Sequence, residues 1–213
     1  MTKPCEPRYY TRSVLKAIAP SIVKGGILLD LGAGTAKYRT ILEMLVDEYL
    51  TMDLVKGREI KVTADAHYLP LRDHCLDYIL CTSVIEHLED PSRSISEMSR
   101  CLKSNGTLLL STCFIYPFHR SPNDYYRFTA EGLLLLLEKH GFKDVKIIKL
   151  GGLPSCLLTL WFKCLEVART PLAKVFLKIA YLMKSLLEAL VDRLDDIVVS
   201  EDGLGFFTIA RRS

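Results

Sequence analysis

Two acids and two glycines near the start of the chain have the types and spacing of a nucleotide-type ligand site. A short apolar run, residues 27–29, predicts a buried strand that ends at Asp30, and Gly32 and Gly34 follow it. Glycine allows a tight turn and a close approach to a ligand, because it has no Cβ. A carboxylate at Asp30 would repel a pyrophosphate and suits a ligand with a cationic head. Asp53 stands 19 positions after Gly34, a spacing at which an acid at the end of the second strand can accept from ribose hydroxyls.

The Asp30-x-Gly32-x-Gly34 pattern resembles the first motif of class I S-adenosylmethionine-dependent methyltransferases, in the small-molecule branch called methyltransferase type 11. The ligand of that family carries an ammonium and a sulfonium and no phosphate. A dinucleotide fingerprint has a third glycine where this chain has Lys37, so a nicotinamide oxidoreductase is disfavoured.

The resemblance implies S-adenosylmethionine as the cofactor and a set of residues around it. The implied cofactor-binding residues are Asp30, Gly32, Gly34, Asp53, Asp65, Ala66, Ser83 and Val84. The two glycines would pass under the methionine portion, with the first acid near the ammonium and the second on the ribose hydroxyls. Asp65 and Ala66 would contact the adenine. The backbone of Ser83 and Val84 would complete the floor.

The loop over residues 115–129 is rich in side chains that could meet a methyl acceptor. It holds one histidine, three tyrosines, two phenylalanines and two arginines. We expect His119, Tyr125 and Arg127 to be the catalytic residues, with His119 the best candidate for a base if the acceptor atom carries a proton. The string around them resembles methyltransferases of glycan and cell-envelope biosynthesis. The alternative is a lid in which these side chains only pack.

A metal site is not expected. Several relatives hold a metal with a Glu-x-x-Glu-His segment after the fourth strand. This chain has Ser83 in place of the first glutamate, which leaves Glu86 and His87. Two ligands do not make a metal site.

Apolar runs and turn residues predict the elements that position these side chains. Strands are expected at 27–30, 48–53, 59–64, 78–81, 107–114, 145–150 and 205–211. Helices are expected at 11–19, from the glycine turn to about Asp47, from Pro91 to Asn105-Gly106, and at 133–139. With the resemblance, this order predicts an α/β fold: a Rossmann-like seven-stranded mixed sheet, flanked by helices, whose last strand is antiparallel. We expect one methyltransferase domain, 1–213.

Residues 153–197 are expected to form a helical insertion before the last strand. Two helices are predicted, at 155–168 and 172–194, and the second combines a wide apolar face with a polar stripe. No uncharged apolar run reaches the roughly 18 residues that span a bilayer. Three interpretations stay open for this segment: packing on its own domain, a homodimer interface, or peripheral contact with a membrane.

Composition limits the partners and the compartment. The chain has 213 residues with a net charge of +3, too small to indicate bulk attraction to nucleic acid. Seven scattered cysteines and a polar N-terminal segment broken by prolines predict a cytoplasmic protein without a signal peptide, and peripheral attachment at the inner membrane face stays open as an alternative. The predicted function is methyl transfer to a small-molecule, glycan or lipid-linked acceptor. The alternative is a non-catalytic, cofactor-binding adaptor that acts through its helical insertion.

Overall fold

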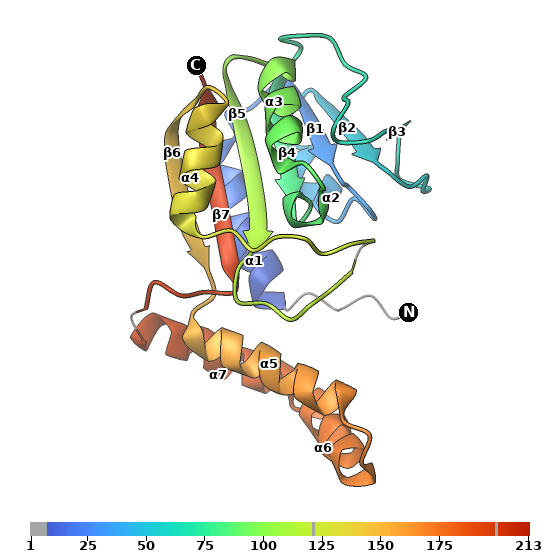
Figure 1. Ribbon diagram of the computed structural model, residues 1–213, viewed down its shortest axis with the longest axis vertical. Helices are drawn as coiled ribbons and strands as arrows, with labels where there is room; N and C mark the ends of the chain where they lie inside the picture. Colours follow the sequence, from blue (N-terminus) through green and yellow to red (C-terminus); the bar gives the residue numbers. More distant parts are fainter. Residues whose placement is uncertain (1–7, 121, 199) are drawn as a thin grey trace.

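A seven-stranded mixed sheet forms the centre of the protein, in a computed structural model that describes residues 8–120, 122–198 and 200–213 (Figure 1). The strands are β1 (Ile27–Leu31), β2 (Glu48–Asp53), β3 (Val62–Thr63), β4 (Leu76–Thr82), β5 (Leu102–Cys113), β6 (Phe142–Leu150) and β7 (Gly205–Arg212). Their order across the sheet is β3-β2-β1-β4-β5-β7-β6. The five strands from β3 to β5 are parallel, so their carboxyl ends meet at one edge of the sheet.

Strand β7 lies between β5 and β6 and is antiparallel to both. Its register places Ile209 opposite Leu109 of β5 and Lys146 of β6. The predicted fold class, with a mixed sheet and an antiparallel last strand, is confirmed.

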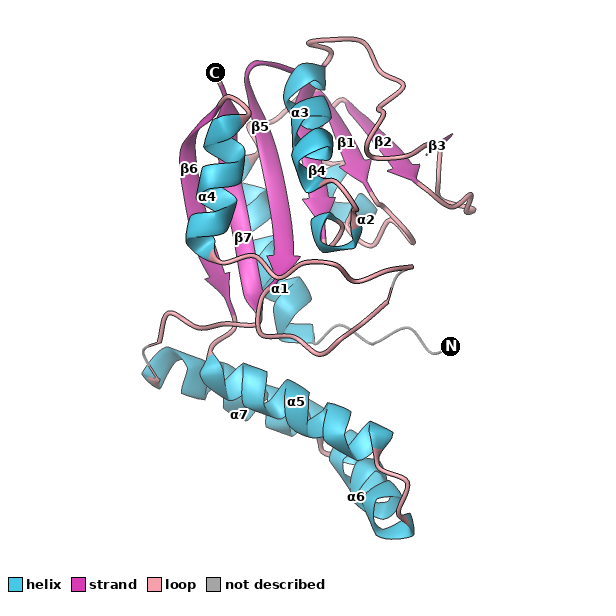
Figure 2. Cartoon of the chain, viewed as in Figure 1, coloured by secondary structure: helices cyan, strands magenta, loops and turns pink. Residues whose placement is uncertain are grey.

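Helices cover both faces of the sheet (Figure 2). They are α1 (Arg8–Ile18), α2 (Arg39–Leu42), α3 (Pro91–Cys101) and α4 (Ala130–Lys139), with single 3₁₀ turns at Ala19–Ser21 and Ile85–His87. Helices α3 and α4 bury Ile95, Met98 and Leu133 on one face. Helices α1 and α2 bury Val14 and Leu42 on the other. Because both faces are covered, the parallel strands are apolar on both sides, as in other parallel sheets.

Two helices are shorter than expected. The helix after the glycine turn covers only Arg39–Leu42, because the next amides, Met44 and Leu45, bond to carbonyls three residues back and tighten the chain into turns. Helix α3 ends at Cys101, and Asn105-Gly106 lies inside β5 instead of ending the helix. Asn105 has φ +62°, and the pairing of β4 with β5 shifts register beside it.

Three helices fill the segment between β6 and β7: α5 (Leu153–Val167), α6 (Pro171–Leu182) and α7 (Lys184–Ile197). We call them the helical arm. Figure 1 shows the arm projecting beyond the carboxyl edge of the sheet. One helix was expected over 172–194; the structure divides it at Met183, whose φ of −91° and ψ of 0° interrupt the helix. None of the helices formed by the described residues is both long and apolar enough to cross a membrane.

The base of the arm is joined firmly to the sheet. The Ser155 hydroxyl and amide both donate to the carboxylate of Asp195, which ties α5 to α7. A Cβ on Gly152 would lie 2.8 Å from that carboxylate, so glycine is required for the approach. Cys156 is buried among residues of the sheet, including Leu150 and Phe207. The arm therefore has a fixed base and a projecting end.

Candidate active site at the carboxyl edge of the sheet

The glycine turn after β1 is built by contacts to the neighbouring strands. Gly32 and Gly34 have φ of +72° and +56°. The amide of Gly32 donates to the carbonyl of Met52 at 2.7 Å. A Cβ on Gly32 would lie 2.2 Å from Cγ2 of Val84, so only glycine fits against the segment after β4. A Cβ on Gly34 would meet no atom within 4 Å, so the turn faces open space at that point.

Asp53, at the end of β2, holds the turn directly. Its Oδ2 accepts from the Gly34 amide at 2.9 Å and its Oδ1 from the Val55 amide at 3.0 Å. A carboxylate has about four lone-pair sites, so Asp53 retains acceptor capacity toward a ligand. The predicted pairing of the glycine turn with the acid 19 residues later is thus a direct contact.

Asp30, near the end of β1, is more deeply buried than Asp53. Its residue is 2% exposed, and the hydroxyl of Tyr49 donates to its Oδ2. Burial raises the pKa of Asp30 from 3.8 to about 6, against the hydrogen bond from Tyr49 and the charges of Lys37 and Arg39, which lower it. Asp30 is therefore a carboxylate kept in an environment that disfavours its charge.

The remaining predicted cofactor residues follow β3 and β4. Asp65 binds His67 through its Oδ1, which accepts from the amide at 2.9 Å and lies 2.6 Å from the imidazole Nδ1. Burial would raise the pKa of Asp65, but these contacts outweigh it and lower the pKa. Ala66 is buried beside it. Ser83 has φ +52°, and its amide donates to the carbonyl of Ser111 at 3.0 Å.

Two of the three predicted catalytic residues lie close together. Asp124, whose side chain is inaccessible to solvent, accepts from the Arg127 guanidinium at 2.5 and 2.8 Å. The same carboxylate accepts from the His119 amide at 2.8 Å. Burial would raise the pKa of Asp124, and these two partners lower it below its usual range. Arg127 thus holds the loop in shape through Asp124.

Tyr125 points elsewhere. It is 43% exposed, and its hydroxyl donates to Glu89 Oε1 at 2.9 Å. The amides of Tyr125 and Tyr126 both donate to the carbonyl of Glu86, which fixes the loop to the segment after β4. Tyr125 therefore lies on the rim of the loop, away from the Asp124 contacts.

The structure brings together three side chains that the sequence does not group: Glu86 and Cys113, which are buried, and His119 of the loop, which is half-buried. Their potential ligand atoms all lie within 4.8 Å of one another. Glu86 is fully buried; its Oε2 accepts from the Thr112 hydroxyl at 3.1 Å, and its Oε1 has no hydrogen-bond partner among the described residues. The sequence left Glu86 and His87 as the two candidate metal ligands of this segment. In the structure the His87 Nδ1 instead contacts the carbonyl of Asn123.

The electrostatics of this group favour neutral side chains. Burial raises the pKa of Glu86 and of the Cys113 thiol, and burial lowers the pKa of His119. The His119 Nδ1 lies 3.1 Å from the Pro117 carbonyl, which can only accept, so Nδ1 carries the proton and Nε2 is left as an acceptor. The group could hold a metal or accept a proton. The expectation that no metal binds stays a prediction.

Two surface hollows lie away from these residues. One is lined by Asp90, Arg93 and His140 among others, and the other by Tyr78, Lys103 and Arg211 among others, at the opposite edge of the sheet. Neither is lined by a predicted site residue.

Comparison with known proteins agrees with this geometry. Residues 29–110 match the family model of a methyltransferase domain, Methyltransf_11. An uncharacterized protein of Methanocaldococcus jannaschii is 25% identical over 63% of this chain and 73% of its own length. Malonyl-[acyl-carrier protein] O-methyltransferase of Methylococcus capsulatus is 33% identical over 40% of this chain and 36% of its own length.

Solved structures show the same fold. Phosphoethanolamine N-methyltransferase 2 of Haemonchus contortus, in complex with S-adenosyl-L-methionine, has a TM-score of 0.59 at 19% identity, covering 95% of this chain and 51% of that one. The chain spans about a third to a half of the length of the named methyltransferases that it matches in sequence. The family model over residues 29–110, the relatives and the fold together support a class I, S-adenosylmethionine-dependent methyltransferase domain in this chain.

Proposed function

We propose that the carboxyl ends of β1, β2 and β4 hold S-adenosylmethionine and that the loop over residues 115–129 holds the methyl acceptor. The observation that carries this proposal is the open side of the glycine turn at Gly34, with the Asp53 carboxylate bonded to its amide. Such a turn allows the backbone to approach a ligand closely. The acid beside it can accept from ribose hydroxyls.

The other cofactor residues keep their predicted roles in this proposal. Asp30 favours a cationic group, since an ammonium nearby would stabilise its charged form. Asp65 and Ala66 border the adenine, and Ser83 and Val84 form the floor against Gly32. When bound, S-adenosylmethionine supplies a methyl group that leaves its sulfonium by in-line displacement. The protein mainly positions the two reactants.

His119 is the proton acceptor in this proposal. With the proton on Nδ1, its Nε2 is the acceptor, and burial lowers the pKa of His119, which favours the neutral imidazole. This role applies if the acceptor atom carries a proton, as a hydroxyl does. Arg127 acts as a positioning residue through Asp124, and Tyr125 contacts the acceptor from the rim.

We further propose that the methyl acceptor is a small molecule, a glycan or a lipid-linked group. The resemblance of the 115–129 loop favours the last two. Homodimer formation and peripheral membrane contact through residues 153–197 stay predictions. No observation favours a non-catalytic adaptor.

One binding series tests the cofactor site. Gly34→Ala should weaken S-adenosylhomocysteine binding at least tenfold, because the added Cβ enters the open side of the turn. The fold should persist, since Ala36 adopts φ +51° in the same turn. Ala36→Gly is the matched backbone control and should bind within about twofold of the unchanged protein. His119→Ala should also bind within about twofold, because it lies in the acceptor half.

Isothermal titration measures each affinity, and the ligand at 100 times its Kd should stabilise the unchanged protein by about 2.7 kcal/mol. Unchanged binding by a folded Gly34→Ala variant would place the cofactor elsewhere. A loss in His119→Ala equal to that in Gly34→Ala would assign the loop to the cofactor pocket.

A further inference from the structure

The charged side chains of the segment that contains α6, at the projecting end of the helical arm, are all positive. We call residues 169–184 the arm tip. Its ionisable side chains, apart from Tyr181, are Arg169, Lys174, Lys178 and Lys184, and it contains no aspartate or glutamate. The ionisable residues that follow along α7 are mostly acidic: Glu188, Asp192, Asp195 and Asp196, with Arg193 as the one cation among them. Along α6 and α7 the cations therefore gather in the tip and the carboxylates nearer the base. Two carboxylates reach the tip itself: Glu166 of α5 accepts from the Tyr181 hydroxyl at 2.7 Å, and Glu188 lies 3.8 Å from the Lys184 ammonium.

Helix α6 presents three distinct faces. Its packed face is made by small or half-buried side chains, Ala173, Leu177 and Ala180. On the opposite side, spaced about 3.6 residues per turn, lies a continuous apolar face. Its members and their exposed fractions are Leu172 66%, Val175 54%, Phe176 51%, Ile179 46%, Leu182 87% and Met183 44%.

The lysines border this apolar face. Lys174 and Lys178 are one turn apart, and both are exposed. On a helical projection they lie along one side of the apolar face, between it and the packed face. A helix with an exposed apolar face and bordering lysines has the pattern of an interfacial helix that lies in the plane of a membrane surface.

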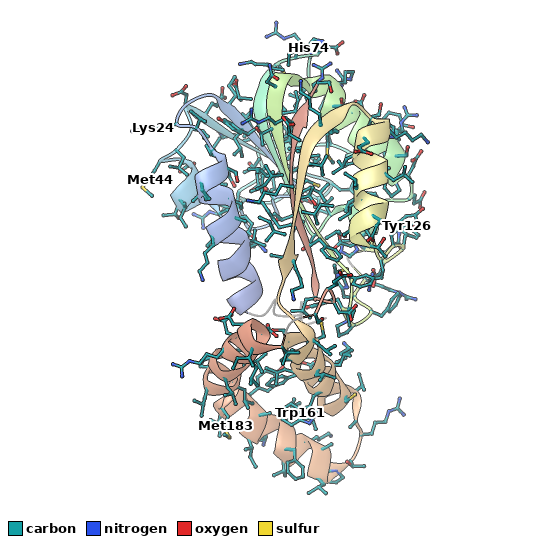
Figure 3. The ribbon with its side chains drawn as sticks, turned by 90° about the vertical axis from the view of Figure 1, so that its left-hand side faces the viewer. Lys24, Met44, His74, Tyr126, Trp161 and Met183 are labelled. Carbon is teal, nitrogen blue, oxygen red and sulfur yellow. The ribbon has the colours of Figure 1, made fainter. Side chains whose placement is uncertain are left out.

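Aromatic side chains accompany the tip. Trp161 of α5 is 43% exposed, and Tyr181 is 48% exposed while its hydroxyl donates to Glu166 at 2.7 Å. Figure 3 shows Trp161 and Met183 on the arm, at the end of the molecule away from His74. Tryptophan and tyrosine are enriched at membrane interfaces because their rings are amphipathic.

We propose that the arm tip binds an anionic lipid surface, with α6 lying along it and its apolar face among the headgroups and upper acyl chains. A second copy of this chain suits the tip less well. A two-fold dimer through this face would set the tip's cations against the same cations of its partner, because an isologous interface repeats one patch.

Lipid binding by the arm tip would also affect the active site. This further step rests on the proposed function. Figure 1 shows the loop over residues 115–129 between the sheet and the arm. Lipid binding by the tip would therefore hold the acceptor side of the site near the membrane surface, where lipid-linked acceptors lie.

Vesicle flotation of the full chain tests the proposal. Phosphatidylcholine vesicles with and without phosphatidylglycerol are compared, and binding should require the anionic lipid and weaken at high salt. The double variant Lys174→Glu/Lys178→Glu should lower partitioning at least twentyfold, since each lysine near an anionic surface contributes about fivefold (about 1 kcal/mol). Lys143→Glu/Lys146→Glu, on exposed positions of β6, makes the same charge change away from the tip and should bind much more strongly than the tip variant.

A second variant tests the apolar face. Phe176→Ser/Ile179→Ser should also lose partitioning while its melting temperature stays unchanged, because both side chains are exposed. A folded, unchanged protein that ignores anionic vesicles would overturn the proposal, as would equal losses in the tip and β6 variants. A dimer by light scattering that Phe176→Ser/Ile179→Ser converts to monomer, without vesicle binding, would assign the face to a second copy. Flotation needs neither cofactor nor turnover, so its failure leaves the cofactor titrations standing.

Discussion

Leucine side chains are mostly buried in the sheet and mostly exposed on the helical arm. Leu28, Leu80 and Leu108 of the sheet are fully buried. Leu157, Leu182 and Leu186 of the arm are 61%, 87% and 65% exposed. Burial of a leucine contributes about 1.5–3 kcal/mol to folding, and the arm leucines forgo most of that contribution. The sheet is therefore held together by its apolar side chains, whereas much of the arm's apolar surface serves no folding purpose within this chain.

The sheet has an exception of the opposite kind. Asp30 is a carboxylate in a buried position, which is unfavourable for folding because the charged group loses its hydration. The comparison thus identifies two places where the usual distribution of polar and apolar residues is reversed. We propose cofactor binding for one and lipid contact for the other.

The largest expected effect is a matched pair of leucine truncations. Leu80→Ala should lower the free energy of unfolding by about 2–5 kcal/mol, because it leaves a cavity in the core. Leu182→Ala should change it by less than about 0.5 kcal/mol, because the side chain is exposed. Denaturant unfolding at several protein concentrations measures both. A large loss in Leu182→Ala that grows with concentration would mean that a partner copy covers the arm.

The next effect concerns Asp30. Between about pH 4 and pH 6 the folded chain binds more protons at Asp30 than the unfolded chain, so stability falls as the pH rises through that range. Asp30→Asn removes this loss and keeps an acceptor for the Tyr49 hydroxyl. At pH 7 the variant should be more stable by up to roughly 3 kcal/mol, the equivalent of the pKa shift.

Urea unfolding at about pH 5 and about pH 7.5 should show the gap between Asp30→Asn and the unchanged protein widening with pH. S-adenosylhomocysteine should bind the variant more weakly. A gap that is the same at both pH values would remove Asp30 as the titrating group.

The smallest effect compares two helix caps. The Thr129 hydroxyl accepts from the Gly132 amide at 3.0 Å at the start of α4, and the Thr170 hydroxyl accepts from the Ala173 amide at 3.3 Å at the start of α6. Each threonine-to-alanine change should weaken its own helix by about 1 kcal/mol. Only Thr129→Ala should lower the global free energy of unfolding, because α4 packs on the sheet.

In Thr170→Ala, amide hydrogen exchange in α6 should instead accelerate about fivefold without a change in global stability, because the arm tip opens locally. A global loss in that variant equal to the loss in Thr129→Ala would show that tip and sheet unfold as one unit.

The sequence alone predicted the seven strands, the glycine turn with Asp53 behind it, the antiparallel last strand and the helical segment before it. These features depend on short-range signals: apolar runs, glycines and acids at set spacings, and a resemblance carried by neighbouring residues. Each of these features can be recognised in the sequence itself. The parallel strands, for example, must be apolar on both faces, so they appear as short apolar runs.

Only the tertiary structure decided the rest. Glu86, Cys113 and His119 lie 6–33 positions apart along the chain, on three different segments, and no spacing brings them together in advance. The pKa of Asp30 depends on burial, and the role of Arg127 on its contact with Asp124. The exposure of α6 depends on what the arm packs against. A periodic pattern shows that a face is apolar, and only the neighbours of that face in three dimensions decide whether it is covered.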